Sequence, residues 1–256
     1  MNKHNVLYAI IGLLAGFIIG FIYANQVNRE QSGGARPPAE TRPNANTAQT
    51  NDNGARDARG GSSTPGSPSP DEIREAIAKA DARAEDVALQ RNFGMVLYRY
   101  ANQTQNAEFL PSVARMLKRA YDADPQDRDL AVALGNVYFD MGQASDPARF
   151  ADAREYYLKA LELKADDVNV RTDLGLTYYY GQPSDPARAI AEYRKSLALD
   201  PRHEPTLQNL AAALIAARKT DEAQKIIEQL SGLNPQNPAL PNLRAQMAQS
   251  RNRNPE

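Results

Sequence analysis

Cysteine is absent from this 256-residue sequence, and histidine occurs only at positions 4 and 203. Without cysteine the chain has no disulfide bond, no thiolate metal ligand and no cysteine nucleophile. His4 and His203 lie in different segments. This disfavours a zinc site or a serine-histidine hydrolase, because such sites use several histidines or one beside the nucleophile. We therefore expect no metal, no cofactor and no enzymatic activity.

An excess of positive charge is also missing, since 30 Lys and Arg residues face 31 Asp and Glu residues. A nucleic-acid-binding domain normally carries a basic patch, so we expect no nucleic-acid partner. The acidic cluster at residues 122, 124, 127 and 129 lacks the glycine and the distant glutamate of a calcium loop. Instead, Asp127 or Asp129 is expected to cap the helix that follows.

Charge is absent altogether from residues 6–24, VLYAIIGLLAGFIIGFIYA. A helix of this length crosses the hydrocarbon core of a bilayer, so we predict a transmembrane span after a short tail, residues 1–5. The residues around Ala24 make a poor signal-peptidase site, which favours an uncleaved anchor. Flanking charges do not settle the orientation, but the short tail and the large polar domain favour export of that domain over a cytosolic location. We expect a single-pass protein of the bacterial inner membrane with its folded domain in the periplasm.

Small residues recur in this span, with Gly12, Gly16 and Gly20 spaced four apart on one stripe of the helix. Such a stripe lets a second helix approach closely, which suggests a homodimer in the membrane. The alternative is that glycine is simply common in membrane helices.

Large apolar residues are nearly absent from residues 25–70, which are rich in Gly, Pro, Ser, Asn, Thr and Arg. Such a segment cannot offset its ordering entropy by burial, so we predict a disordered linker. A lipid-binding basic arm is disfavoured because Glu30 and Glu40 interrupt the arginines. Order is expected to begin with Ser69 as a helix cap, Pro70 at the first helical position and Glu72 completing a capping box.

The helix that this signal starts places Ile73, Ile77 and Ala80 on one face, as expected of a helix that caps an array. Beyond it, residues 85–237 repeat one pattern. The sequence LGNVY at 134–138 is followed by LGLTY at 174–178 and, more loosely, by LAAAL at 210–214, with an earlier copy around Phe93 and Gly94. A second helix follows each copy, and a turn ends each unit, as at Pro201 and Pro235.

This pattern resembles the tetratricopeptide repeat, whose units of about 34 residues carry Leu-Gly, Tyr, Ala and Pro at fixed offsets. The resemblance implies an all-α fold, a right-handed superhelical solenoid of about four helical hairpins with capping helices, over residues 71–250. The repeats are expected at 85–127, 128–167, 168–203 and 204–237, with a closing helix at 238–250. The first three units are longer than the reference length, and we expect the extra residues between the paired helices.

Two features of the repeats have a direct physical interpretation. Gly135 and Gly175 lie where the paired helices approach closely, while the nearby tyrosines fill the space between hairpins. The phrase SDPAR occurs at 145–149 and at 184–188, so Asp146 and Asp185 are expected to cap the second helix of their hairpins.

The family resemblance also implies a binding groove along the first helix of each hairpin. Its groove positions, transferred one by one, are Met95, Tyr98, Val132, Asn136, Phe139, Thr172, Leu176, Tyr179, Gln208, Ala212 and Ile215. Such a surface suits an extended or helical peptide. Some family members hold a partner's terminal carboxylate with paired Asn and basic residues. Only Asn136 matches that pattern here, so we do not expect this mode of recognition.

The resulting hypothesis is a non-enzymatic adaptor, tethered to the membrane, that binds a protein or peptide segment in this groove. The overall layout is similar to anchored repeat proteins that assist c-type cytochrome maturation, which suggests a chaperone-like role in envelope protein assembly. The alternative is a structural subunit of a membrane or secretion complex.

Overall fold

The computed structural model describes residues 68–252. The predicted tail 1–5, the span 6–24 with Gly12, Gly16 and Gly20, and nearly all of the linker lie outside the described residues. Within 68–252 every regular element is a helix, as the all-α prediction requires. Of the helices in this part of the chain, none combines the length and the apolar character needed to cross a bilayer.

The described elements follow one another as α2 (Pro70–Asp81), α3 (Val87–Thr104), the 3-10 turn η1 (Ala107–Phe109), α4 (Leu110–Ala123), α5 (Arg128–Ala144), α6 (Arg149–Leu163), α7 (Val168–Tyr180), α8 (Pro186–Leu199), α9 (Glu204–Ala216), α10 (Thr220–Leu233) and α11 (Leu240–Asn252). The chain divides into two compact units, residues 1–78 and 79–256. Helix α2 crosses that boundary, and α3–α11 all belong to the second unit.

Helix α2 begins with the predicted capping box. The Glu72 N–H donates to Ser69 Oγ at 3.3 Å, and the Ser69 N–H donates to Glu72 Oε2 at 2.7 Å. These reciprocal bonds satisfy two N–H groups at the helix terminus. Ile73, Ile77 and Ala80, the expected apolar face, are buried.

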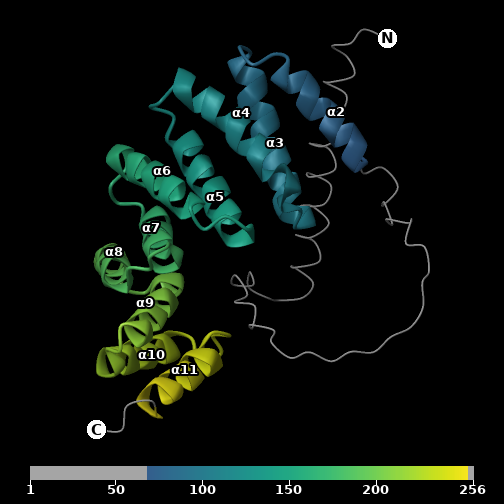
Figure 1. Ribbon diagram of the computed structural model, residues 1–256. Helices are drawn as coiled ribbons and strands as arrows, with labels where there is room; N and C mark the ends of the chain where they lie inside the picture. The colour runs from purple at the N-terminus through teal and green to yellow at the C-terminus, as the bar shows by residue number, and fades with distance from the viewer. Residues whose placement is uncertain (1–67, 253–256) are drawn as a thin grey trace, which may run out of the picture. The chain divides into compact units, whose positions relative to one another are not determined.

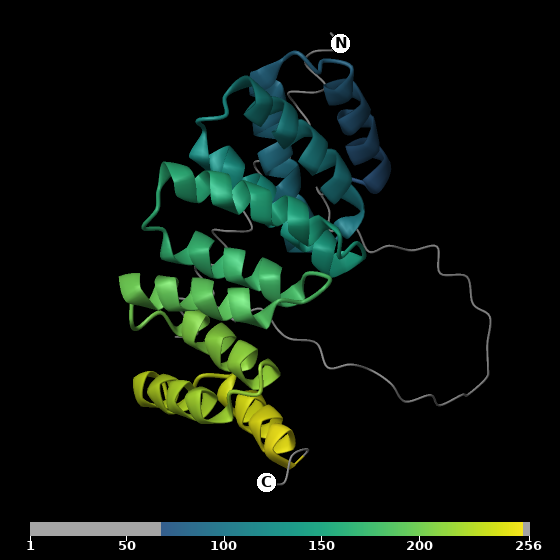
Figure 2. The same cartoon turned by 60° about the vertical axis from the view of Figure 1, so that its left-hand side comes forward.

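In the second unit, helices pair into hairpins that stack in sequence order, α3 with α4, α5 with α6, α7 with α8, and α9 with α10 (Figures 1 and 2). The second helix of each hairpin also packs on the first helix of the next one. The first helices α3 and α5 contact each other, as do α7 and α9, and α5 and α7 lie toward the inside of the curve in Figure 1. We call the side of this unit formed by α3, α5, α7 and α9 the inner face.

The close approach within hairpins depends on glycine, as predicted. A Cβ added to Gly135 would lie 2.5 Å from the Tyr157 ring, and one added to Gly175 would lie 2.4 Å from the Tyr193 ring. Tyr157 and Tyr193 are fully buried. Each ring therefore fills the space inside its own hairpin, against the glycine of the partner helix, rather than only the space between hairpins.

Helix starts follow the capping predictions except at one position. Asp127 caps α5 by accepting from the Leu130 N–H, and Asp185 caps α8 by accepting from the Arg188 N–H, both at 3.0 Å. The prediction for Asp146 was wrong, because α6 begins only at Arg149. Asp146 instead stabilises a turn, accepting from the Ala148 N–H and from the Arg149 guanidinium.

The extra residues of the early repeats are also placed differently from the prediction. Helices α3 and α5 have 18 and 17 residues, whereas α7 and α9 have 13 each. Part of the added length thus extends the first helix by about one turn, and the loops take the rest. The closing helix is present as α11, where Leu240, Leu243 and Met247 are buried in one cluster with residues of α8–α10.

Candidate functional site

The predicted groove residues all lie on the first helices of the hairpins, and most of them are half-buried. This group consists of Met95, Tyr98, Val132, Asn136, Phe139, Leu176, Tyr179, Gln208 and Ala212. Half-burial is what a binding surface needs, since the side chain is held in place but still presents atoms to a partner. Two members are not on the surface, because Thr172 and Ile215 are buried.

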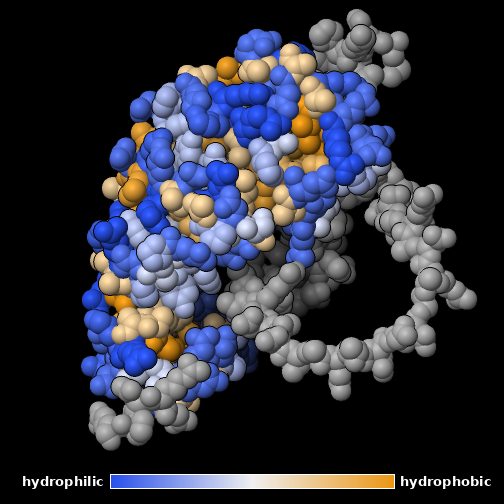
Figure 3. All heavy atoms as spheres, viewed as in Figure 1, coloured by the Kyte–Doolittle hydropathy of each residue, from blue (hydrophilic) through white to orange (hydrophobic). Residues whose placement is uncertain are grey.

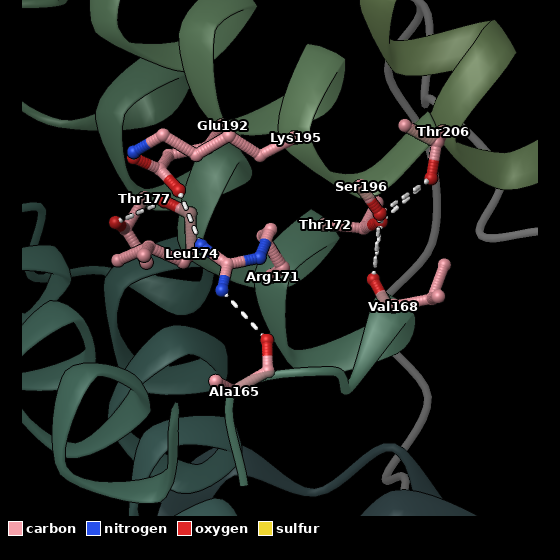
Figure 4. Close-up of polar contacts among 10 residues, drawn as sticks. All are labelled: Ala165, Val168, Arg171, Thr172, Leu174, Thr177, Glu192, Lys195, Ser196 and Thr206. Atoms are coloured by element: carbon pink, nitrogen blue, oxygen red, sulfur yellow. Dashed lines mark hydrogen bonds and ion pairs between the residues drawn. The ribbon is translucent and has the colours of Figure 1, made fainter. Parts of the chain in front are cut away.

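Thr172 belongs to a buried hydroxyl cluster between the third and fourth repeats (Figure 4). Its Oγ1 lies 2.8 Å from Ser196 Oγ and 2.6 Å from Thr206 Oγ1, and it donates to the Val168 carbonyl at 2.7 Å. The residue therefore helps to join α7, α8 and α9 and has no free hydroxyl for a ligand. Thr172 occupies a position that lines the groove in the family, but in this chain the residue packs between two repeats.

Two other predicted groove residues, Tyr98 and Asn136, form hydrogen bonds with residues of this chain. Tyr98 of α3 donates its hydroxyl to Asp140 Oδ2 of α5 at 2.7 Å. Tyr157 reaches through its hairpin and donates to Asn136 Oδ1 at 2.9 Å. Asn136 is thus positioned by the buried tyrosine, and its amide N–H groups donate to no residue within 68–252.

Gln208, at the C-terminal end of the inner face, is bound to the loop before α11. Its Nε2 donates to Asn237 Oδ1 at 3.0 Å, and Asn237 Nδ2 donates in turn to Glu204 Oε2 at 2.8 Å. Asn234 Nδ2 donates to the same Glu204 oxygen. This network fixes the start of the closing helix, so Gln208 has a structural partner that the sequence did not reveal.

Aromatic side chains gather where α5 and α7 end. Phe139 lies 5.3 Å from Phe150 and 6.3 Å from Tyr180, and Tyr180 lies 5.1 Å from Tyr179, measured between ring centroids. Tyr180 is 38% exposed although it is a large aromatic residue. We refer to Phe139, Tyr179 and Tyr180 as the aromatic patch.

Two carboxylates on the inner face were missed by the sequence analysis. Asp140 lies one helical turn after Asn136, and Asp173 lies one turn before Leu176, so helical spacing alone could have found them. Burial raises the pKa of Asp140, partly offset by the Tyr98 hydrogen bond. Burial, with the charges of Asp167 and Asp140, raises the pKa of Asp173 to about 7.

Asp173 stands out because it accepts no hydrogen bond and forms no ion pair with any residue in the range 68–252. Three guanidinium groups on the first helices are bound to other carboxylates: Arg91 to Asp127 at 2.9 Å, Arg128 to Asp167, and Arg171 to Glu192 at 3.1 Å. Figure 4 shows Arg171 held between Glu192 and the Ala165 carbonyl, to which it donates at 2.7 Å. The inner face therefore carries two carboxyl groups, Asp140 and Asp173, that form no ion pair within residues 68–252.

The face of the molecule seen in Figure 3 gives less indication of a site. In the view of Figure 3, hydrophilic residues dominate and apolar ones form small separate patches. Among the described residues, no group of three or more His, Asp or Glu side chains is arranged to hold a metal ion.

Comparison with known proteins agrees with this architecture. Residues 182–247 match a family described as tetratricopeptide repeat. The solved structure of YrrB, described as a tetratricopeptide-repeat protein with an unusual peptide-binding site, has a TM-score of 0.54 and 18% identity, and the match covers 68% of this chain and 84% of that one. MamA from MSR-1 has a TM-score of 0.51 and 18% identity, covering 64% and 88%.

Comparison with curated proteins finds no match. At these identities the structural likeness concerns the fold alone. The family match covers the last hairpin and the elements around it, and the same hairpin geometry recurs from α3 onward. The last repeat therefore matches the tetratricopeptide repeat in sequence, and the hairpins from α3 onward have the fold of solved tetratricopeptide-repeat proteins.

Proposed function

We propose that this chain is a non-enzymatic adaptor that binds a segment of another protein along the inner face of its repeats. The observation that carries the proposal is the row of half-buried apolar and aromatic side chains on successive first helices, among them Met95, Val132, Leu176 and the aromatic patch. Such a row offers apolar contact at helical intervals, which is how grooves recognise extended or helical peptides. The likeness in fold to YrrB, whose description names a peptide-binding site, supports this use.

A short segment buries an area at the low end of protein interfaces, so we expect a dissociation constant on the order of micromolar. A photo-crosslinking amino acid placed at position 95 or 176 of the full chain, in its native membrane, should join to a partner protein. The matched control is position 158 on α6, where Leu158 is 43% exposed but is not on a first helix. Equal crosslinking at all three positions would contradict the proposal.

The combined change Leu176→Ala and Tyr179→Ala should abolish this capture while circular dichroism shows unchanged helicity. The control is Leu158→Ala with Leu199→Ala, which removes two exposed apolar side chains from second helices. If the partner copurifies at fixed stoichiometry with both double variants, the chain is better regarded as a structural subunit.

The adaptor is further proposed to be anchored by residues 6–24, with the repeats exported and two copies associating through the glycine stripe. Because the chain has no cysteine, Ser250→Cys provides a unique thiol. In cells with a permeabilised outer membrane, a membrane-impermeant maleimide should label it, whereas labelling only after lysis would place the repeats in the cytosol.

Gly16→Ile should weaken the dimer in membranes. A role in c-type cytochrome maturation stays a narrower hypothesis about the partner.

A further inference from the structure

A comparison of the second and third repeats reveals polar groups without partners on the inner face. Tyr157 passes Gly135 and donates its hydroxyl to Asn136. Tyr193 passes Gly175 in the same way, but the residue after that glycine is Leu176, which has no acceptor. The Tyr193 hydroxyl is fully buried and has no hydrogen-bond partner within the described chain.

This hydroxyl lies within electrostatic range of Asp173, the carboxylate that also lacks a partner in the range 68–252. Asp173 is close enough to Tyr193 for its charge to raise the pKa of the phenol, after burial as the main cause. Tyr179 and Tyr180 of the aromatic patch act on the same phenol. The third repeat thus holds an unpaired acceptor and a buried, unpaired donor that are close enough to interact electrostatically but do not bind each other. Buried polar groups in native proteins are normally paired, so such a pair indicates a site that a ligand completes.

The second repeat adds a further negative charge to this place. Asp140 lies near enough to Asp173 to raise its pKa, and the only hydrogen-bond partner of Asp140 in the range 68–252 is the neutral Tyr98 hydroxyl. Two carboxylates that share a poorly solvated surface without a cation repel each other. A positive group placed between them would remove that repulsion and gain two charge-assisted hydrogen bonds.

The aromatic patch defines the shape of the group that would fit. Phe139 is next to Asp140 in sequence and contacts Tyr180, which contacts Tyr179. Aromatic faces favour cations and also cover the methylene stem of a long basic side chain. A metal ion would use only the carboxylates, whereas a lysine or arginine would use both the carboxylates and the rings.

We propose that Asp140, Asp173 and the aromatic patch form a subsite for one lysine or arginine side chain of the protein segment bound in the groove. The subsite rests on the proposed adaptor function and specifies the partner: a segment with a basic residue among apolar ones. This charge preference is opposite to that of repeats that hold a partner's carboxylate.

The test is a selection of displayed random dodecapeptides on the full chain, purified in a non-ionic detergent. The wild type should enrich apolar peptides that share a Lys or Arg at one position. The variant Asp140→Asn with Asp173→Asn should retain the apolar preference and lose the basic one, while the control Glu162→Gln, which removes an exposed carboxylate from α6, should behave as the wild type.

Two results would overturn the subsite and are distinguishable from each other. Peptides that lack a preferred basic residue, but are lost with Leu176→Ala and Tyr179→Ala, would refute the subsite and leave the adaptor function intact. If the wild type enriches nothing above background, both proposals fail.

A second measurement does not depend on the double variant. For an enriched peptide, replacing its basic residue by norleucine should weaken binding to the wild type by about tenfold or more. The same replacement should matter little for Asp173→Asn. Equal losses for both proteins would mean that the basic residue binds elsewhere, and the subsite would be wrong.

Discussion

At the scale of single residues, glycine determines how closely the helices of a hairpin approach. Gly175→Ala should destabilise the folded unit by about 1 to 3 kcal/mol, because the new methyl group would overlap the buried Tyr193 ring. Urea denaturation measures this change. The control is Gly232→Ala on α10, where the added Cβ meets no atom within 4 Å. There the higher helix propensity of alanine should leave stability equal or raise it.

Asp173 gives a prediction about pH. Its pKa rises from about 3.8 unfolded to about 7 folded, so the folded state binds the proton more tightly. Stability then falls as pH rises from about 4 to about 7, and the cost of the charge is complete above that range. Asp173→Asn should therefore raise the free energy of unfolding at pH 8, by up to a few kcal/mol, with no gain at pH 4. A destabilised variant at pH 8 would contradict the unpaired environment.

Asp127 should behave in the opposite sense and serves as the comparison. Burial alone would raise its pKa, but hydrogen bonds from the Leu130 N–H and from Arg91 outweigh burial and lower the pKa. Its stabilising contribution is therefore present at neutral pH and is lost as pH falls below the usual range for aspartate. The sequence predicted a cap at Asp127 or Asp129, and the structure has it at Asp127. The state of Asp173 could not be predicted in this way, because it depends on the burial and the charges that folding imposes.

At the scale of elements, the two copies of the sequence SDPAR, at 145–149 and 184–188, differ in whether their aspartate caps a helix. Asp185→Ala should cost about 1 kcal/mol, because it removes the acceptor for the first turn of α8. Asp146→Ala should cost less, since Asp146 lies in a turn before α6 and its partners are partly exposed. Urea denaturation of both variants measures the two losses in the free energy of unfolding. Equal costs would mean that both residues act as caps despite the later start of α6.

The order and type of the helices could be predicted because each hairpin carries its own periodic apolar face. The lengths of α3 and α5 could not be predicted in the same way. The residues added to these repeats are compatible with either a loop or another helical turn, and the packing of Gly142 against the Phe150 ring shows that α5 continues into contact with α6.

At the scale of the whole repeat unit, stability should depend on contacts between neighbouring repeats, since each hairpin packs mainly on the next. Leu243→Ala removes a buried side chain of α11 that covers the last hairpin. We expect a loss of about 2 kcal/mol or more. Hydrogen exchange followed by mass spectrometry should become faster in α9–α11 and stay unchanged in α3–α6. Faster exchange throughout would indicate a single cooperative core.

The sequence by itself determined the helical type and order of the hairpins, the caps at the starts of α5 and α8 and the glycines at the hairpin contacts, because these follow from local periodicity and local backbone chemistry. Only the tertiary structure decided which inner-face side chains are free. Thr172 and Gln208 are bound to residues in later elements, Asn136 is bound by Tyr157 of the next helix, and Asp173 is left without a cation. Those outcomes depend on which helices become neighbours and on how burial removes water, and local periodicity does not encode either of them.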